Sequence, residues 1–477
     1  MPRTARRTRS GQQNSPCIET SDSSTCSVPA SFLIRGQLPR DPGAQTARLA
    51  TQFISQNRSL LSELGATVEQ RYDGQNVDLV IRSTTKVGAV PLLSPTTGRP
   101  DYGLVVKPRF EWTGLGPMLA DMGWRVTPAP LSLPMLPRSE RKIPAWVLSS
   151  IVLFRLRILL DQLERRFELV HEARSAPRGS VDWTSYAITS VARAQFLRVP
   201  CRFPDLRDDR DLKGAIRFAL QKQLQALEGQ RTAGTFVLAL ITLCGDLLAR
   251  VRDVAPRVPA PREFESWLRG SLKGESYRDG LRAIEWTADD RGLAGLADLQ
   301  GLPWVMSMEK FFEAWCEAVL AKVATKIGGT LRSGRLRQTV VPLSWDPPYL
   351  GSQKSLLPDL VLERGETTII VDAKYKEHWE EMQALHWGQL EEQLRERHRA
   401  DLLQVLAYAN LSRTPRIVVC LAYPCSRATW ASLRDRGRLF HRASLRAGDR
   451  NVDLLLTAFP MGERIEEVAS QFAKEVT

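Results

Sequence analysis

The chain has 477 residues, a formal net charge of +13, 43% apolar residues and 25% charged residues. This length allows two or three domains, and the composition is ordinary for a globular protein. The sequence predicts no membrane-spanning helix, because the most apolar stretch, Trp146–Leu160, is interrupted by Arg155 and Arg157. The positive charge favours an anionic partner such as nucleic acid, although an arginine-rich proteome would give the same excess.

The cysteines are odd in number and scattered, and no CxxC occurs among them. This pattern predicts a reducing cytoplasm and argues against a disulfide framework, a zinc knuckle and an iron–sulfur cluster. The five histidines form neither HxxxH nor HExxH, which argues against a zinc hydrolase. The seven cysteines are Cys17, Cys26, Cys201, Cys244, Cys316, Cys420 and Cys425.

In chain order, residues 1–45 are rich in Ser, Thr, Arg and Pro and predict a disordered basic tail. They lack the apolar core of a secretory signal. Residues 46–140 predict a mixed α/β domain, with a helix at Arg48–Leu64 and strands at Val77–Arg82 and Gly103–Lys107. A turn is expected at Ser94–Pro100, between the two strands.

The middle of the chain, residues 141–253, predicts a helical region. Its apolar-periodic runs are Ala145–Leu169, Leu212–Leu227 and Thr235–Val251. The proline-rich Val254–Arg262 opens a linker region that we place at residues 254–299. The last domain is expected at residues 300–477, so the fold class is α+β with several domains.

The chemistry concentrates in two predicted strands joined by a turn at Gly365 and Glu366. So short a connection requires an antiparallel hairpin. Asp359 and Asp372 are equally far from the turn centre, which predicts that they face each other with Cβ atoms about 5 Å apart. Lys374, two residues beyond Asp372, shares that face.

Two carboxylates about 5 Å apart repel each other by roughly 3 kcal/mol at an effective dielectric constant of about 20. A hard divalent cation reverses the sign, and Mg²⁺ typically takes one or two carboxylates together with water and phosphate oxygens. The pair therefore predicts a Mg²⁺ site, which Mn²⁺ could also occupy. The structural alternative is that Asp359 caps a turn and that Asp372 and Lys374 form an ordinary ion pair.

Two helices flank the hairpin in the sequence. The first begins after Ser307, its expected N-cap, and carries Glu309, Glu313 and Glu317 in one row, of which we interpret Glu309 and Glu317 as solvated. The second follows the hairpin. It presents Gln404 and Tyr408 on one face, preceded by the candidate DNA-binding residues Arg395, Arg397 and Arg399, which a solvated basic face would explain equally well.

This order of helix, hairpin, helix and strand resembles the PD-(D/E)xK nuclease superfamily, in its branch with a QxxxY helix. The resemblance covers about residues 300–425. It implies an α/β nuclease domain with a mixed central sheet. In the family's pattern, Glu313, Asp359 and Asp372 hold the metal, Lys374 serves the attacking water, and Gln404 and Tyr408 are accessory groups.

A narrower resemblance is to the McrC family, the nuclease subunit of McrBC modification-dependent restriction systems. It rests on Val371–Lys376, Asp401–Tyr408, Leu104–Arg109 with Met118 and Leu119 after it, and Arg178–Asp182. It implies a DNA endonuclease in prokaryotic antiviral defence. Its N-terminal part would engage a hexameric AAA+ NTPase, usually a GTPase (McrB-like), and no membrane would be involved. The N-terminal tail and the proline-rich segment depart from the family pattern.

Two other functions fit the same residues. An autonomous PD-(D/E)xK nuclease in DNA repair or in a mobile element would need no partner and would cut DNA alone with Mg²⁺. A non-catalytic adaptor of an NTPase would explain why more than half of the chain lies outside the nuclease segment, but it would not need an intact set of two acids and a lysine.

Overall fold

The chain divides into two compact units. Unit 1 combines Met1–Val147 with Gly292–Thr477, and unit 2 is Leu148–Arg291, an insertion in the sequence of unit 1. In the computed structural model, no helix of the described part is long and apolar enough to cross a membrane. The described residues are 17–34, 42–74, 76–110, 118–119, 121–123, 125–131, 145–163, 166–207, 209–268, 274–289, 292–293, 301–349, 351–376, 379, 392–447 and 450–476.

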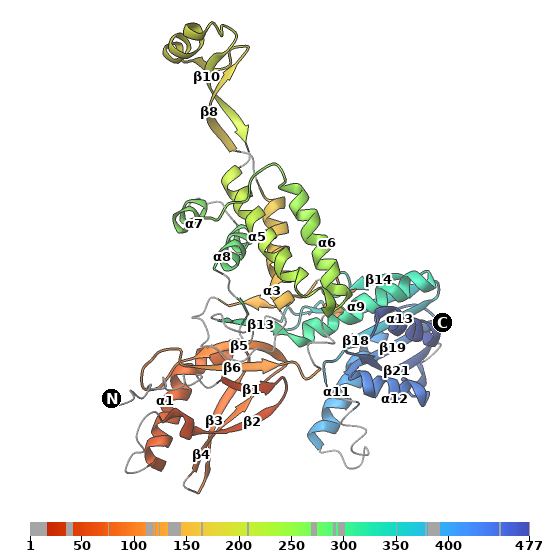
Figure 1. Ribbon diagram of the computed structural model, residues 1–477. Helices are drawn as coiled ribbons and strands as arrows, with labels where there is room; N and C mark the ends of the chain where they lie inside the picture. The colour runs from red at the N-terminus through yellow and green to blue at the C-terminus, as the bar shows by residue number, and fades with distance from the viewer. Residues whose placement is uncertain are drawn as a thin grey trace, which may run out of the picture. The chain divides into compact units, whose positions relative to one another are not determined.

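The first part of unit 1 contains two small sheets and a long helix (Figure 1). One sheet has the order β1-β6-β5-β13-β7, and the other has the order β2-β4-β3. The elements are β1 (Cys17–Ser21), β2 (Thr25–Pro29), η1 (Ala30–Leu33), α1 (Pro42–Glu63), β3 (Thr67–Asp73), β4 (Asn76–Arg82), β5 (Lys86–Leu92), β6 (Tyr102–Lys107), β7 (Ala129–Pro130) and β13 (Trp304–Ser307).

The apolar face of α1 packs against these strands to form a core. Phe53 of α1 lies edge-on to Tyr102 of β6, with ring centroids 5.9 Å apart, and Phe32 contacts both rings. The expected helix and the two expected strands are thus confirmed. The expected tail at residues 1–45 is wrong where the structure describes it. Within Cys17–Ile34, β1 pairs with β6 and β2 pairs with β4. Ile18 of β1 and Leu33 of η1 are buried. Residues 1–16 and 35–41 lie outside the described residues.

Strand β13 connects the two parts of unit 1. It follows unit 2 in the sequence, yet it pairs antiparallel with β5, with Trp304 opposite Ala89. Gly88 of β5 has a φ of +152°, and a Cβ atom there would lie 2.1 Å from the carbonyl oxygen of Trp304. Close approach of the two backbones therefore requires glycine at this position.

The second part of unit 1 is a six-stranded mixed sheet of order β14-β17-β18-β19-β21-β20. Strands β18, β19 and β21 are parallel and their other neighbours antiparallel. Its strands are β14 (Thr330–Ser333), β17 (Leu360–Arg364), β18 (Thr367–Ala373), β19 (Arg416–Cys425), β20 (Phe440–Ala447) and β21 (Arg450–Pro460). Two short pairs lie outside this sheet: β11 (Gly292–Leu293) with β12 (Gly301–Leu302), and β15 (Val341–Pro342) with β16 (Ser355–Leu356).

Helices cover both faces of this sheet (Figure 1). Helix α11 (Glu392–Ala409) connects β18 to β19, and α12 (Arg427–Asp435) lies between β19 and β20 in the sequence. Helix α11 packs against β18 and β19, and α12 packs against β21 on the same side of the sheet. On the other face, α9 (Met308–Ile327) packs against α13 (Ile465–Val476). The mixed sheet that we expected for the last domain is present.

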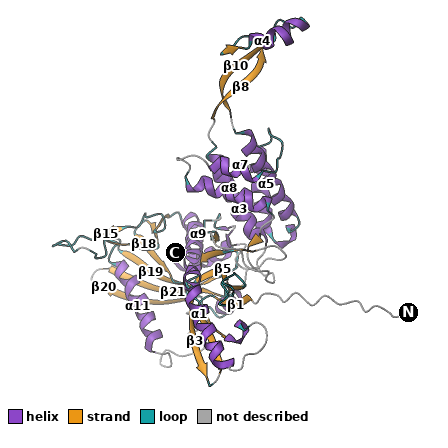
Figure 2. Cartoon of the chain, turned by 90° about the vertical axis from the view of Figure 1, so that its left-hand side faces the viewer, coloured by secondary structure: helices purple, strands orange, loops and turns teal. Residues whose placement is uncertain are grey.

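Unit 2 is mainly helical, as Figure 2 shows, but it also contains a long β-hairpin. The hairpin pairs β8 (Arg166–Arg174) with β10 (Val199–Arg207) and carries β9 (Ser180–Val181) and the short helices α4 (Trp183–Ser185), η2 (Tyr186–Ser190) and η3 (Val191–Arg193). The helices are α3 (Ala145–Asp161), which begins at the end of unit 1, α5 (Arg210–Glu228), η4 (Arg231–Ala233), α6 (Thr235–Arg250), α7 (Pro261–Leu268) and α8 (Glu275–Ala288).

Two expectations for this unit are wrong. The predicted helix Ala145–Leu169 ends at Asp161, because Arg166–Leu169 enter the β8–β10 ladder. The predicted linker at residues 254–299 contains α7 and α8, and α8 packs against α5 through its apolar stripe. Helix α6 ends at Arg250, before the first proline of this segment, and Pro261 starts α7, since it occupies the first helical position, where its missing N–H costs nothing.

Candidate active site

The β17–β18 hairpin places Asp359 and Asp372 at one edge of the mixed sheet. Leu360 pairs with Val371, and the same register continued by one residue sets Asp359 opposite Asp372. The turn between the strands includes Gly365 with a φ of +52°, in the left-handed region that glycine tolerates. Asp359 is further fixed by the backbone N–H of Ala373, which donates to its Oδ2 atom at 2.9 Å. The predicted cross-strand relationship of the two acids is therefore confirmed.

A chain of polar contacts leads from Asp372 through Lys374 to helix α11. Lys374 Nζ lies 2.8 Å from Asp372 Oδ2 and donates to Gln404 Oε1 at 3.0 Å. Gln404 Nε2 in turn donates to the Tyr408 hydroxyl at 3.0 Å. The two pairs of the predicted constellation, DxK on the strand and QxxxY on the helix, thus meet in one array.

Helix α9 brings Glu313 to the same place. Ser307 caps the helix by accepting a hydrogen bond from the N–H of Lys310, as predicted. Glu313, farther along the same helix, lines a cavity of about 560 Å³ together with Asp359 and Lys374. Burial raises the pKa of Glu313; Arg335 opposes this effect, and the charges of Glu317 and Asp372 add to it.

The carboxylates destabilise one another's charge. Burial and then the charge of Asp372 raise the pKa of Asp359 to about 7, against the opposing effect of the Ala373 N–H and with a further contribution from Glu313. Burial acts to lower the pKa of Lys374, but the charge of Asp372, followed by those of Asp359 and Asp401, outweighs it and raises that pKa. The site is a place where a positive charge is favoured.

Whether these residues suit a divalent cation depends on the number of donors. Asp372 is only 1% exposed, and its Oδ2 atom accepts no hydrogen bond although it lies beside Lys374. Among the described residues, no three acidic, histidine or cysteine side chains surround a single point. Mg²⁺ commonly takes two carboxylate oxygens and completes its coordination shell with water and phosphate oxygens, so Asp359 and Asp372 suit it. Glu313 lines the same cavity as Asp359.

The structure corrects our interpretation of Glu317. This side chain is not solvated: it is only 3% exposed. Arg335 contacts it with Nε at 2.9 Å and Nη2 at 3.1 Å, Arg125 Nη1 lies at 2.5 Å, and the Ser333 hydroxyl donates to it at 3.0 Å. Glu309, by contrast, is exposed as expected. A buried carboxylate needs such partners, which the helical periodicity of the sequence could not reveal.

The expected DNA-binding residues of α11 separate in the structure. Arg397 is exposed and lines the 560 Å³ cavity, whereas Arg399 forms a surface ion pair with Glu396 at 3.0 Å. The side chain of Arg395 lies outside the described residues. Only Arg397 of the two that are described therefore reaches the cavity of the acids.

Several residues of the site were not predicted. Lys376 forms two short hydrogen bonds with Asp401 of α11, at 2.7 and 2.8 Å, and the Tyr423 hydroxyl donates to the same carboxylate at 3.2 Å. Asp401 precedes Gln404 by almost one helical turn, so this contact fixes the helix beside Lys374. The sequence signal for these contacts is the pair of lysines at positions 374 and 376, which matches the acid and the amide at positions 401 and 404.

The first part of unit 1 also contributes to the site. Arg109, two residues after β6, lies over the Tyr375 ring with its guanidinium carbon 4.5 Å from the centroid. Its Nε atom lies 3.3 Å from Asp22 Oδ2, and its backbone N–H donates to Asp22 Oδ1 at 2.7 Å. Ser23, Thr85 and Arg109 line the 560 Å³ cavity. The cavity of the acids is therefore built from both parts of unit 1.

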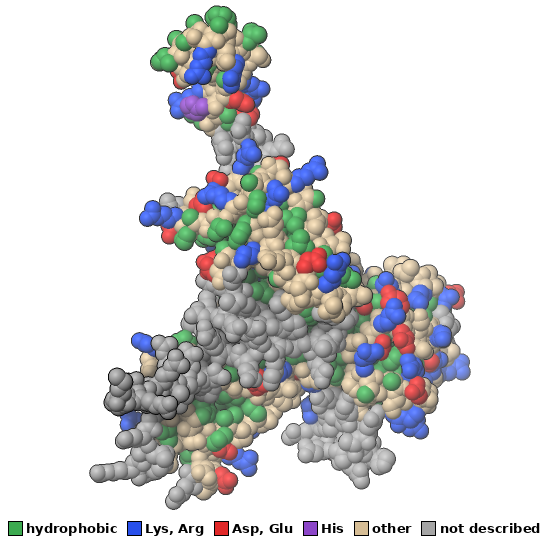
Figure 3. Space-filling view, viewed as in Figure 1, with side chains coloured by type: hydrophobic (Ala, Val, Ile, Leu, Met, Phe, Trp, Pro, Cys, Tyr) green, Lys and Arg blue, Asp and Glu red, His purple; other side chains and the backbone are tan. Residues whose placement is uncertain are grey.

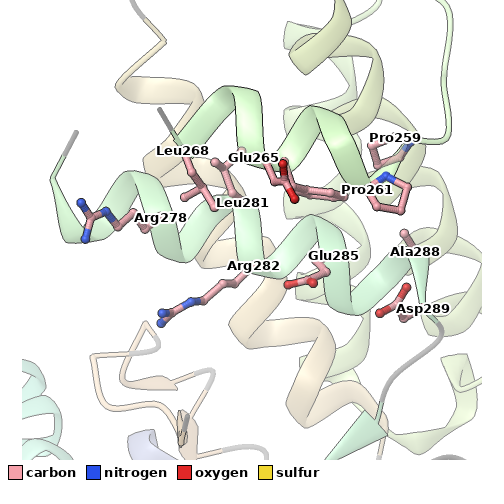
Figure 4. Close-up of a pocket in the computed structure, with 11 residues that line it drawn as sticks. Pro259, Pro261, Glu265, Leu268, Arg278, Leu281, Arg282, Glu285, Ala288 and Asp289 are labelled. Atoms are coloured by element: carbon pink, nitrogen blue, oxygen red, sulfur yellow. The ribbon is translucent and has the colours of Figure 1, made fainter. Parts of the chain in front are cut away.

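Unit 2 has a cavity of its own, of about 730 Å³, between α7 and α8 (Figure 4). Its lining includes Arg278 and Arg282 along α8, followed by Glu285 and Asp289. Glu265 and apolar side chains form the rest, and no acid lies opposite another across a hairpin as at Asp359. This cavity shows no array comparable to that of the acids and lysine in unit 1.

The family model described as McrBC 5-methylcytosine restriction system component matches residues 133–424. This range spans more than half of the chain and includes the hairpin and α11. The chain belongs to this family. The resemblance to the McrC family is thereby confirmed at the level of the McrBC family. The comparison with curated proteins gave no match.

Two solved assemblies are similar to the chain at low identity. One is a half-complex from a tetradecameric assembly of Thermococcus gammatolerans McrB AAA+ hexamers with bound McrC (14% identity, TM-score 0.42, 97% of this chain and 100% of that chain). The other is the Thermococcus gammatolerans McrBC complex (16% identity, TM-score 0.26, 64% of this chain and 88% of that chain). Neither TM-score reaches 0.5, so the family assignment stands on the sequence match.

Proposed function

We propose that this McrBC-family protein is the DNA endonuclease subunit of a restriction complex in prokaryotic defence, with a PD-(D/E)xK nuclease domain at residues 300–477. The observation that carries the proposal is the hairpin, which sets Asp359 opposite Asp372 and joins Lys374 to Gln404. A purely structural ion pair would not need a second acid with a pKa near 7 beside it. Paired acids at such a cost are typical of a functional site.

The residues present assign the roles. Asp359 and Asp372, with Glu313 nearby, would hold Mg²⁺ or Mn²⁺, which supplies electrophilic stabilisation of the charge that develops on a phosphate. Lys374 has one N–H directed to Gln404 and pairs with Asp372, which leaves a proton to donate to a water or a phosphate oxygen. Gln404 and Tyr408 orient this lysine, and Arg397 contributes positive charge to the same cavity.

The proposed partner is a hexameric AAA+ NTPase of the McrB kind. The contact could use the end of the β8–β10 hairpin, which presents large apolar side chains to solvent (Figure 3). Trp183 is 69% exposed, Ile188 68% and Leu197 76%. Apolar side chains gathered at the end of a hairpin are typical of a protein-binding surface. We had expected this contact in the N-terminal part, and the two surfaces can be compared by substitution.

The test of the activity is Asp372→Asn, with Asp435→Asn as a matched control. Asp435 is an exposed acid of α12 that lines neither of the cavities that contain Asp359. DNA cleavage is measured with the partner NTPase, its nucleotide and Mg²⁺, and also with the protein alone. We expect Asp372→Asn to lower cleavage at least about 100-fold without lowering the Tm, and Asp435→Asn to leave cleavage unchanged.

Each outcome decides something. Full cleavage by Asp372→Asn would exclude the proposed active site and favour a non-catalytic adaptor. Equal cleavage by the wild type with and without the NTPase would favour an autonomous nuclease. Affinity purification from the native host addresses the partner directly: a stoichiometric AAA+ NTPase supports the restriction complex, and its absence argues against it.

A further inference from the structure

The buried carboxylate of Glu317 holds two arginines that come from distant parts of unit 1. Arg335 is bound through Nε and Nη2, in the bidentate geometry that gives guanidinium–carboxylate pairs their strength. Arg125, 192 positions before Glu317, is bound through Nη1. Glu317 is the buried charged side chain of α9, and its carboxylate holds both cations.

The arrangement contains more positive charge than Glu317 can neutralise. Two guanidinium groups face a single carboxylate, and the side chains of Arg125 and Arg335 are 40% and 28% exposed while that of Glu317 is 5% exposed. Each arginine has five N–H donors, of which Glu317 takes one from Arg125 and two from Arg335. An anion in solvent can therefore use the remaining donors without breaking the contact.

These arginines line a cavity of about 590 Å³, together with Lys310, Glu313 and Asp359. The 560 Å³ cavity that contains Lys374 and Arg397 is lined by the same two acids, Glu313 and Asp359. The acids thus lie where two cavities meet. Positively charged side chains line both cavities: Arg109, Lys374, Lys376 and Arg397 in the first, and Lys310, Arg125 and Arg335 in the second.

We propose that Arg125 and Arg335, held in place by Glu317, form a binding site for a backbone phosphate of the nucleic-acid strand, next to the phosphate that lies at Asp359 and Asp372. The strand would then run from one cavity to the other across the acids. This proposal rests on the proposed function, because it assumes that the strand enters the cavity of the acids.

Pre-organisation explains why the chain buries Glu317. A long, free arginine side chain loses rotamer freedom when it binds a phosphate, and this loss opposes binding. Here that freedom is already restricted by hydrogen bonds to Glu317. Two fixed cations beside the acids also offset the repulsion that a phosphate would experience from Glu313 and Asp359.

The test is the salt dependence of DNA binding, measured by fluorescence anisotropy of a labelled oligonucleotide without divalent cation. The variants are Arg125→Gln and Arg335→Gln in the full-length protein. The matched control is Lys322→Gln, an exposed lysine of the same helix that lines neither cavity. Each lost phosphate contact should reduce the slope of log K against log salt by about 0.7 for a single strand or about 0.9 for a duplex.

We expect a reduced slope for Arg125→Gln and for Arg335→Gln and an unchanged slope for Lys322→Gln. Slopes equal to that of the wild type in both arginine variants would overturn the proposal. If the melting curve shows that Arg335→Gln does not fold, Arg125→Gln and Arg335→Lys test the proposal instead. Arg125→Gln should reduce the slope, and Arg335→Lys should keep the slope of the wild type. A wild type that binds no DNA would instead contradict the proposed function.

Competition separates a strand phosphate from a free one. Inorganic phosphate and GTP are added, each at a fixed ionic strength, to the wild type with bound oligonucleotide. Weak competition by both anions in the wild type supports a site for strand phosphates. Tight GTP binding that is lost in Arg125→Gln would show a nucleotide site and overturn the proposal.

Discussion

Arg109 stacks on Tyr375, with 4.5 Å between its guanidinium carbon and the ring centroid, so a residue that follows β6 contacts the neighbour of Lys374. Asp22 Oδ2 lies 3.3 Å from Nε of the same guanidinium. The segment that carries Lys374 is thus supported by a different sheet from the one it leaves. A shift of the first sheet would therefore change the position of Lys374.

We therefore expect Arg109→Ala to lower the kcat of DNA cleavage about 10-fold or more, with little change in KM, because it releases Tyr375 and loosens Lys374. Arg109→Lys should lose less, since an ammonium retains a cation–π contact but not planar stacking. Steady-state cleavage by the complex is the measurement. The control is Arg82→Ala, an exposed arginine of β4, and equal losses in Arg82→Ala and Arg109→Ala would contradict the prediction.

A second prediction concerns the ion pair of Lys376 with Asp401, which fixes α11. The Asp401 side chain is 7% exposed and that of Lys376 33%, so only the acid is fully desolvated. Asp401→Asn leaves the lysine without its partner, and we expect a loss of about 2 kcal/mol in the free energy of unfolding. Urea unfolding followed by circular dichroism measures this loss. A variant as stable as the wild type would show that the pair does not hold the helix.

The raised pKa of Asp359 predicts a pH dependence of stability. In the unfolded chain this carboxyl titrates near 4, and in the folded protein its pKa is about 7. The folded state therefore binds the proton more tightly. Its contribution to stability is fully present below pH 4 and is lost as the pH rises to about 7. Without divalent cation, Asp359→Asn should lose this component of the pH dependence.

Thermal melts between pH 5 and pH 8 in EDTA measure the effect, with Asp435→Asn as the control. Adding Mg²⁺ should raise the Tm of the wild type more at pH 8 than at pH 6, because the cation competes with the proton for the same carboxylate. An equal rise at both pH values, or a pH profile that Asp359→Asn leaves unchanged, would count against a metal at this carboxylate.

Gly88 supplies a prediction about the fold. A Cβ atom at this position would lie 2.1 Å from the Trp304 carbonyl oxygen, so Gly88→Ala should push β5 and β13 apart and destabilise the protein by about 1–3 kcal/mol. Gly245→Ala, inside α6, meets open space and should stabilise by up to about 1 kcal/mol. Melting curves of the two variants that shift in the same direction would contradict the argument.

Local patterns predicted the hairpin well. The register of Asp359 and Asp372 follows from symmetry about a two-residue turn, and Ser307 as the N-cap follows from the residue type before an apolar stripe. The contact of Gln404 with Lys374 is compatible with both patterns, but it needs the parallel pairing of β18 with β19, which places α11 against the sheet.

Long-range pairing could not be predicted. Glu317 belongs to an i, i+4, i+8 row of acids that resembles a solvated face, but in the fold it is buried and contacts Arg125, 192 positions away, and Arg335. Strands β1 and β2 lie in a stretch of low hydrophobicity, and they become ordered by pairing with β6 and β4. Similarly, Arg166–Leu169 continue the apolar helical periodicity of the sequence, but in the fold they form a strand that pairs with β10.

The position of β13 has a consequence for how the protein is made. A ribosome synthesises β5 about 200 residues before β13, its partner strand, with all of unit 2 between them. The first sheet therefore stays incomplete while unit 2 emerges, and Asp359, Asp372 and Gln404 emerge later still. No nascent fragment that ends within unit 2 contains the acids. Under the proposed function, the residues that would cleave DNA are thus synthesised only after all of unit 2.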